Sequence, residues 1–210
     1  MRNKLVVSVS PHLHKDESVS KIMWMVVISL IPAGIAGVFI FGISALWVIF
    51  LGISSALITE LILQALSKRK ITVLDGSAFL TGLLLAYNLP PKVPFWLPIV
   101  GSFFAIAIGK QVFGGLGQNI FNPALVGRVF LMASWPKYMT SWINPHWVPD
   151  AVTSATPLGL LKEGKVLEHI SYLDLFLGKR GGCIGEVCIL ALLLGALLLL
   201  IRGYISWHIP

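Results

Sequence analysis

Residues 22–41 read IMWMVVISLIPAGIAGVFIF, and residues 45–66 read ALWVIFLGISSALITELILQAL. Each stretch is apolar for about twenty residues, the length that an α-helix needs to cross the hydrocarbon core of a bilayer. The turn between them, residues 42–44, is short, so we expect an antiparallel helical pair. These two stretches decide the fold class, because a segment in lipid has to satisfy its own backbone hydrogen bonds, and a helix does so.

The composition extends this interpretation to the whole chain. Of the 210 residues, 56% are hydrophobic and only 12% are charged, and the mean hydropathy is +0.85. In soluble domains about a quarter of the residues are charged. We therefore expect an all-α, polytopic integral membrane protein in a lipid bilayer. The net charge of +7 comes from Lys and Arg that are dispersed or lie beside apolar segments, and no nucleic-acid motif is present, so we expect no nucleic acid partner.

The later apolar segments are shorter. Residues 76–89 and 119–135 are too short for a comfortable crossing, and residues 95–109 form a marginal run. Tilted spans are one interpretation; we prefer broken helices whose ends meet at a ligand inside the bundle. Residues 183–201 are rich in Leu and predict a sixth span that ends at Arg202. Cys183 and Cys188 have no metal-ligand spacing, so we expect packing residues and no metal site.

The charge distribution predicts an orientation. Residues 1–21 form a basic arm that we expect in the cytoplasm, with His12 and His14 solvated. Residues 22–135 form a membrane bundle with about five apolar segments, residues 136–181 an extracytoplasmic loop, and residues 182–210 the sixth span with a cytoplasmic end. The predicted location is the bacterial or archaeal cell (inner) membrane, crossed several times.

The polar loop contains a hydroxyl-rich stretch, DAVTSATPLGLLK, at residues 150–162. It matches D-x-x-[ST]-[SG]-A-[ST], a pattern at which a flavin transferase attaches FMN to a hydroxyl through a phosphoester bond. The matching residues are Asp150, Thr153, Ser154, Ala155 and Thr156. Thr156 would be the acceptor, and its small neighbours leave room for the transferase. A second interpretation is a plain loop in which Thr156 caps a helix that begins at Pro157; both can hold before modification.

Asn119 and Asn122 lie three residues apart, and we expect them on one helical face. Each amide offers a donor and an acceptor, which suits the edge of a ring such as an isoalloxazine; helix capping and interhelical hydrogen bonding are the alternative. The glycine-rich residues 114–118 precede them and would leave backbone N–H groups at a helix start, a favourable place for a polar or anionic group. They lack the Lys and Ser/Thr of a phosphate loop.

Arg128 lies in the same apolar segment. An arginine inside the membrane is costly unless it is paired or faces a polar cavity. Asp75, Glu60 and Glu186 are the candidate partners.

Three motifs occur in order along the chain: DGSAFLTGLLLAYNLPP at residues 75–91, GLGQNIFNPALVGR at residues 115–128 and TSATPL at residues 153–158. Together they resemble the membrane flavoprotein subunit shared by the Rnf complex and the sodium-pumping NADH:quinone oxidoreductase, the RnfD and NqrB family, and the chain is closer to RnfD.

The resemblance implies FMN esterified to Thr156, a second, noncovalent riboflavin near Asn119 and Asn122, and electron flow coupled to Na⁺ or H⁺ translocation. It implies the other subunits of an Rnf-type complex and a flavin transferase as partners. The chain would be a redox subunit of a translocating complex rather than a stand-alone enzyme, and we expect no catalytic acid or base in it. Members of the family resemble two inverted five-helix repeats of a urea-transporter-like fold, and this chain would contain the first repeat.

A channel or carrier without redox chemistry is the alternative function. It rests on the broken helices and on Asn122-Pro123-Ala124, which resembles the half-helix motif of water channels. Such a pore needs a second motif on an opposed half-helix, and Asn144-Pro145-His146 falls in the polar loop instead.

Overall fold

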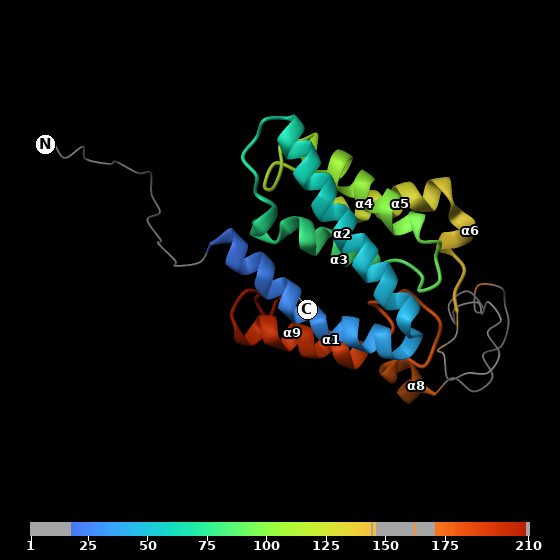
Figure 1. Cartoon of the computed structure of the whole chain (residues 1–210). Helices are drawn as coiled ribbons and strands as arrows, with labels where there is room; N and C mark the ends of the chain where they lie inside the picture. The colour runs from blue at the N-terminus through green and yellow to red at the C-terminus, as the bar shows by residue number, and fades with distance from the viewer. Residues whose placement is uncertain (1–17, 144, 146–161, 163–170, 209–210) are drawn as a thin grey trace, which may run out of the picture.

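The computed structural model describes residues 18–143, 145, 162 and 171–208, and this part is helical without a strand (Figure 1). Two helices are long and apolar enough to cross a membrane: α1, Val19–Phe41, and α2, Ile43–Leu66. Their 23 and 24 residues extend for about 35 Å at 1.5 Å per residue. The expected all-α fold class is confirmed, and these two helices support the membrane assignment.

The other helices are short. They are α3 (Ser77–Tyr87), α4 (Trp96–Ile106), α5 (Pro123–Ser134), α6 (Pro136–Met139), α8 (Tyr172–Leu177) and α9 (Ile189–Ile201), together with the 3₁₀ turn η1 (Val73–Asp75) and the π-helix η2 (Ala107–Gln111). With 11, 11 and 12 residues, α3, α4 and α5 extend for less than about 20 Å each, well below the 30 Å of a bilayer core. The expectation of short helices after α2 is confirmed.

Gly42 alone separates α1 from α2, and its φ of 76° lies in the region that favours glycine. From this corner the two helices diverge, so that α1 lies beside α9 while α2 crosses α3 (Figure 1). The space between α1 and α2 is a groove of about 660 Å³, to which α3 contributes Phe79, Leu83 and Tyr87. The expected helical pair is therefore an open one, with α3 against both helices.

Small residues let the helices approach at backbone distance. A Cβ added at Gly82 of α3 would lie 2.6 Å from the carbonyl oxygen of Gly52 on α2. A Cβ at Gly127 of α5 would lie 2.6 Å from the carbonyl oxygen of Gly101 on α4, and the Ser102 hydroxyl donates to the Gly52 carbonyl at 2.8 Å. In a lipid bilayer the hydrophobic effect does not drive helices together, and close packing at small residues and hydrogen bonds of buried hydroxyls stabilise their association instead.

The prediction of a helix over residues 183–201 is wrong in its first third, because α9 begins at Ile189. The preceding residues instead close the C-terminal end of α3: the Ile184 N–H donates to the Leu89 carbonyl at 3.2 Å, and the Gly185 N–H to the Tyr87 carbonyl at 3.0 Å. The last carbonyls of a helix lack partners within it, and this segment supplies them. Cys183, fully buried, is a packing residue as expected, and its thiol also donates to the Asn88 carbonyl at 3.3 Å.

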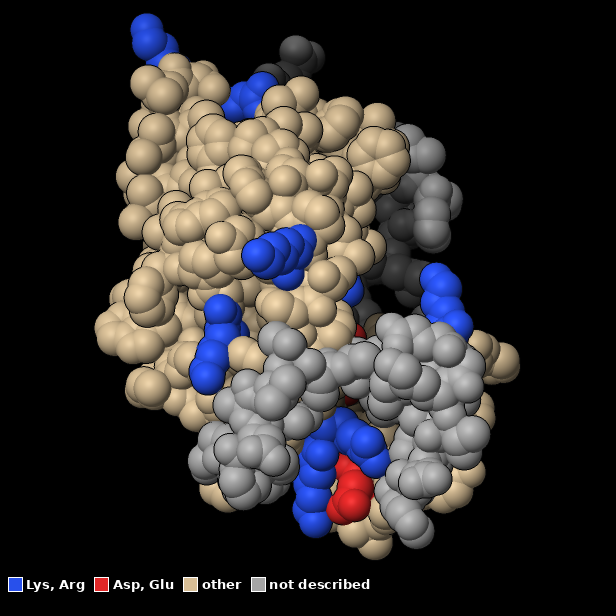
Figure 2. All heavy atoms as spheres, turned by 90° about the vertical axis from the view of Figure 1, so that its right-hand side faces the viewer, with Lys and Arg blue, Asp and Glu red and all other residues tan. Residues whose placement is uncertain are grey.

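The outer surface is predominantly apolar. Figure 2 shows one face on which Lys and Arg occur in small, separate groups among uncharged residues. Large apolar side chains of both long helices are exposed, such as Phe39 at 72% and Phe50 at 58%. Water-soluble monomers rarely expose extended apolar surface, so this surface suits a lipid environment.

Candidate functional site

A buried lysine is the most unusual feature of the interior. Lys110 lies in η2, where the Val112 N–H reaches back five residues to the Ala107 carbonyl at 3.0 Å. Its side chain is 2% exposed, and Nζ lies 2.6 Å from Glu60 Oε1 and 2.5 Å from Ser77 Oγ. A π-helical turn inside a helix is rare and is found mostly at functional sites.

Glu60 is the counter-charge of Lys110 and is completely buried. Its Oε1 also accepts from Gln64 Nε2 at 2.9 Å and from Gln111 Nε2 at 3.1 Å, so three donors converge on one oxygen. Oε2 is buried and has no hydrogen-bond partner among the described residues. Glu60 was one candidate partner of Arg128, and that pairing is wrong, because the carboxylate is paired with Lys110.

Asp75, a second candidate partner of Arg128, has another role. Its Oδ1 accepts from the Ser77 N–H at 2.8 Å and from the Ser77 hydroxyl at 2.5 Å. Ser77 Oγ thus donates to Asp75 and accepts from Lys110. A continuous polar chain runs from Asp75 through Ser77 and Lys110 to Glu60, and it joins η1, α3, η2 and α2.

Lys110 is absent from the sequence-based site, because the predicted apolar segment ends at residue 109. The sequence does contain a signal for this site: a single lysine, followed by Gln111, at the end of a long apolar segment. The same membrane-cost argument that was applied to Arg128 applies to it.

A cavity of about 280 Å³ lies beside this chain. Five of its lining residues are polar and five are not: Ser77, Thr81, Lys110, Asn119 and Asn122, and Met23, Leu80, Leu84, Leu116 and Pro123. This volume lies just below the range of about 300 Å³ and more that is typical of ligand pockets, and the cavity shares their combination of apolar walls with a few convergent polar groups. The ends of α3, η2 and α5 meet here, as the broken-helix interpretation expects.

Asn119 and Asn122 both line this cavity, but the expectation that they share a helical face is wrong. Asn122 is the N-cap of α5, with Oδ1 accepting from the Ala124 N–H at 3.0 Å, and Asn119 lies in the loop before it. Asn119 Oδ1 accepts from the Gly117 N–H at 3.3 Å, and Nδ2 donates to the Phe121 carbonyl at 2.9 Å. The helix starts later because proline is preferred at the first helical position.

The loop before α5 depends on glycine. Gly114, Gly115 and Gly117 have φ of 117°, 107° and 88°, a region that other residues rarely adopt. We expected free backbone N–H groups at the start of this helix. The first helical residue, Pro123, has no N–H, and the Ala124 N–H donates to the Asn122 side chain. The side chains of the two asparagines lie at this edge of the cavity instead.

Arg128 donates from Nη1 to Asn88 Oδ1 at the C-terminal end of α3. Glu186, the third candidate partner, accepts from the Cys183 N–H at 3.1 Å. Within the described residues, Arg128 is therefore held by an amide rather than by one of the three expected carboxylates. It ties α5 to the C-terminal end of α3, to which residues 183–185 also donate hydrogen bonds.

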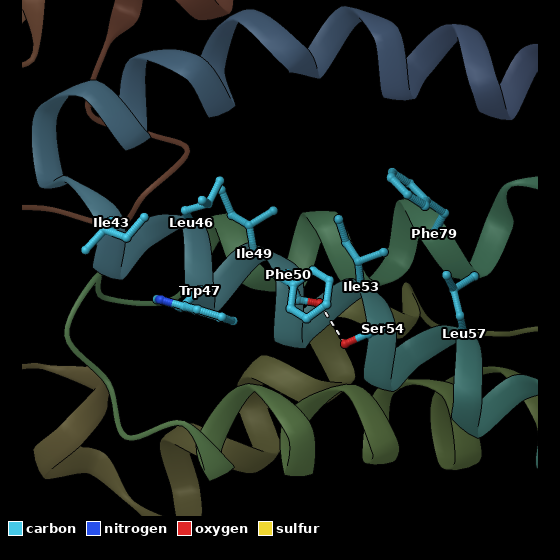
Figure 3. A pocket seen from close by; sticks show the side chains of 9 residues that line it. All are labelled: Ile43, Leu46, Trp47, Ile49, Phe50, Ile53, Ser54, Leu57 and Phe79. Carbon is cyan, nitrogen blue, oxygen red and sulfur yellow. Dashed lines mark hydrogen bonds between the residues drawn. The ribbon is translucent and has the colours of Figure 1, made fainter.

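A groove along α2 is a different kind of site. It has about 670 Å³ and is lined by eight α2 residues and by Phe79 of α3 (Figure 3). The one hydroxyl among these nine side chains, that of Ser54, donates to the Phe50 carbonyl at 2.7 Å, as the dashed line in Figure 3 shows. Such a groove can hold apolar chains and has no group for redox or acid–base chemistry.

The flavinylation pattern lies outside the described residues. This applies to Asp150, Thr153, Ser154, Ala155 and Thr156, and also to His12 and His14. Covalent attachment at Thr156 therefore stays a prediction.

Comparison with known proteins agrees with the three motifs. A family model described as the NQR2, RnfD, RnfE family matches residues 6–210. The D subunit of a proton-translocating ferredoxin:NAD(+) oxidoreductase complex of Clostridium ljungdahlii is 52% identical over all of this chain and 66% of its own length. The D subunit of a Na(+)-translocating ferredoxin:NAD(+) oxidoreductase complex of Acetobacterium woodii is 51% identical over 98% of the chain and 65% of its own length.

A more distant relative, the D subunit of an ion-translocating oxidoreductase complex of Escherichia coli, is 35% identical over 97% of the chain and 68% of its own length. The chain thus spans about two thirds of the length of the curated relatives that it matches.

Proposed function

This chain belongs to the NQR2, RnfD, RnfE family, and on that premise we propose that it is a membrane subunit of an ion-translocating electron transport complex. The observation that carries the proposal is the identity of 52% and 51% to two relatives whose names state ion translocation and ferredoxin:NAD(+) oxidoreduction. The protein would carry covalent FMN on Thr156 and pass electrons between redox subunits of an Rnf-type complex, with Na⁺ or H⁺ as the coupling ion.

The second cofactor in this proposal is a noncovalent riboflavin in the cavity at Asn119 and Asn122. The residues fit a flat ring: apolar side chains such as Leu80 and Leu84 can lie against its faces, and the polar side chains can meet its edge. The bound flavin would exchange one or two electrons, and the protein positions it and sets its electrostatic surroundings. Asn122 contributes most, because only its Oδ1 is engaged within the described residues, which leaves its Nδ2 to donate to the ring.

The flavin content of the purified protein tests this function against a carrier without redox chemistry. After co-expression with the flavin transferase and the other subunits, the denatured chain is expected to stay yellow and the supernatant to contain riboflavin. In the double variant Asn119→Leu and Asn122→Leu, riboflavin should be lost while the covalent flavin remains. A colourless wild-type chain without extractable flavin would favour the carrier; unchanged riboflavin in the variant would return both asparagines to loop and cap roles.

The orientation is part of the proposal. The basic residues 68–70 after α2 and the arm of residues 1–21 would lie in the cytoplasm, and the loop that contains Thr156 on the opposite side. A membrane-impermeant thiol reagent is then expected to label Lys165→Cys in intact cells, in a background without Cys183 and Cys188. Labelling that requires cell lysis would reverse the assignment.

A further inference from the structure

The hydrogen-bonded residues Ser77, Lys110 and Glu60 lie at different distances from the cavity. Lys110 and Ser77 line the cavity at Asn119 and Asn122, whereas Glu60 does not. Lys110 is therefore nearer the cavity than Glu60 is, although its side chain is only 2% exposed. The pair as a whole is neutral, and its positive member is the one that belongs to the cavity wall.

The ammonium also has hydrogen-bonding capacity left. A lysine side chain has three N–H donors. Two are accounted for by Glu60 Oε1 at 2.6 Å and Ser77 Oγ at 2.5 Å, and no third acceptor is found among the described residues. The carboxylate holds the charge in place, and Asp75 holds Ser77 from the other side.

The burial of this pair makes its field strong. Both side chains are at most 2% exposed, so water does not screen the ammonium. The interaction of a charge with its neighbours grows as the local dielectric falls. Taking two charges out of water is costly and gives little net stability, so the pair is poorly explained as a stabilising device alone.

Building on the proposed riboflavin in this cavity, we infer that Lys110 is the group that stabilises negative charge on the ring. An oxidised flavin ring is neutral, and a reduced one can carry a negative charge. A fixed ammonium at the cavity wall binds the reduced, anionic ring more tightly than the oxidised ring, and it thereby raises the reduction potential. Glu60 has the opposite sign and lies farther away, so it lowers the potential by a smaller amount.

The backbone supports this role for Lys110. Gly109 packs so closely on the start of α5 that an added Cβ would lie 2.8 Å from Pro123 Cα. The π-helical turn thus brings Lys110 to the same end of α5 that bears Asn122, and one contact positions both polar groups.

The test uses the complete complex and measures the potential of the extractable riboflavin by spectroelectrochemical titration, with the covalent FMN in the same sample as an internal reference. Lys110→Met alone would leave Glu60 as an uncompensated buried charge and can fail to fold. The informative variants are therefore Glu60→Gln and the double variant Glu60→Gln with Lys110→Met. A matched control is Asp174→Asn with Lys179→Met, which removes an exposed ion pair with a 3.1 Å separation.

The two variants are expected to shift the riboflavin potential in opposite directions. Glu60→Gln should raise it, because the ammonium stays and its counter-charge is gone. The double variant should lower it by at least about 30 mV, which corresponds to a tenfold loss of preference for the reduced ring in a two-electron couple. The covalent FMN and the exposed-pair control should show no shift.

The outcomes separate this inference from the function on which it rests. Unshifted riboflavin in a folded double variant would overturn the role of Lys110 and leave the flavin proposal standing. A wild-type complex without extractable riboflavin would overturn the flavin assignment of the cavity and the inference with it. If the double variant loses riboflavin or does not fold, the sign of the Glu60→Gln shift decides: a raised potential supports the role of Lys110, and an unchanged or lowered potential overturns it.

Discussion

A Thr156→Val chain is expected to be produced in normal amount and to carry no covalent FMN. Valine keeps the β-branched shape of threonine and removes only the oxygen that the phosphoester requires. Two arguments favour Thr156: its position at the end of the pattern that begins at Asp150, and the resemblance of the three sequence motifs to a flavoprotein subunit, which implies a flavin on this loop. Hydroxyl chemistry by itself would not separate it from Thr153 and Ser154. The expected effect is complete, from one covalent flavin per chain to none.

Mass spectrometry of the peptide that contains residues 150–162 measures this effect directly. The wild-type peptide, from protein co-expressed with the transferase, should show the mass of FMN less one water. Thr153→Val provides the matched control: it removes a hydroxyl from the recognition pattern and leaves the Thr156 oxygen able to accept in principle, so partial modification is expected. An adduct that persists in Thr156→Val, or that maps to Thr153, would contradict the assignment.

Gly82→Leu is expected to destabilise the protein more than any other single change at a helix contact that we consider. The new side chain would have to enter the contact between α2 and α3, where a Cβ already meets the Gly52 carbonyl oxygen at 2.6 Å, Ile53 Cα at 2.8 Å and Ala56 Cβ at 2.9 Å. Two of these neighbours are backbone atoms, which cannot rotate away. Overpacking typically costs about 1–3 kcal/mol, and we expect the upper end of this range where backbone atoms block the new side chain.

The measurement is the unfolding midpoint of the purified protein in detergent, together with the yield of folded protein. Ala65→Leu is the control, because Ala65 is an exposed position on α2 and the substitution adds similar apolar volume there. Gly82→Ala should lie between wild type and Gly82→Leu, since part of its steric cost is offset by the helix propensity of alanine, about 1 kcal/mol. If the unfolding midpoint of Gly82→Leu equalled that of Ala65→Leu, the close contact between α2 and α3 would be absent from the folded protein.

Much of the helical structure could be predicted from the sequence. The expected spans 22–41 and 45–66 differ from α1 and α2 by at most three residues at either end. These boundaries are clear because long apolar runs end at Gly42 and at the basic residues after Leu66. The shorter helices were located with less accuracy. The start of α5 was placed at Asn119 rather than Pro123, because local capping by Asn122 decides it, and an asparagine can also occur inside a helix.

The candidate site was predicted in part. Asn119 and Asn122 do line a cavity, but their amides are mostly used by neighbouring backbone groups. Glu60 was one of three candidate partners for Arg128, and its partner in the structure is Lys110 instead. Several cations along an apolar chain are equally plausible partners for a carboxylate until the helices are packed, and Lys110 lies 50 residues from Glu60.

By itself, the sequence determined the membrane character, the family, and the pattern that singles out Thr156, because composition, apolar length and short motifs are local properties of the chain. Only the tertiary structure decided which polar groups meet: Lys110 with Glu60 and Ser77, Arg128 with Asn88, and residues 183–185 with the end of α3. The physical reason is that a buried charge or an unpaired carbonyl has to find a partner, and the packing of helices from distant parts of the chain determines which partner is within reach.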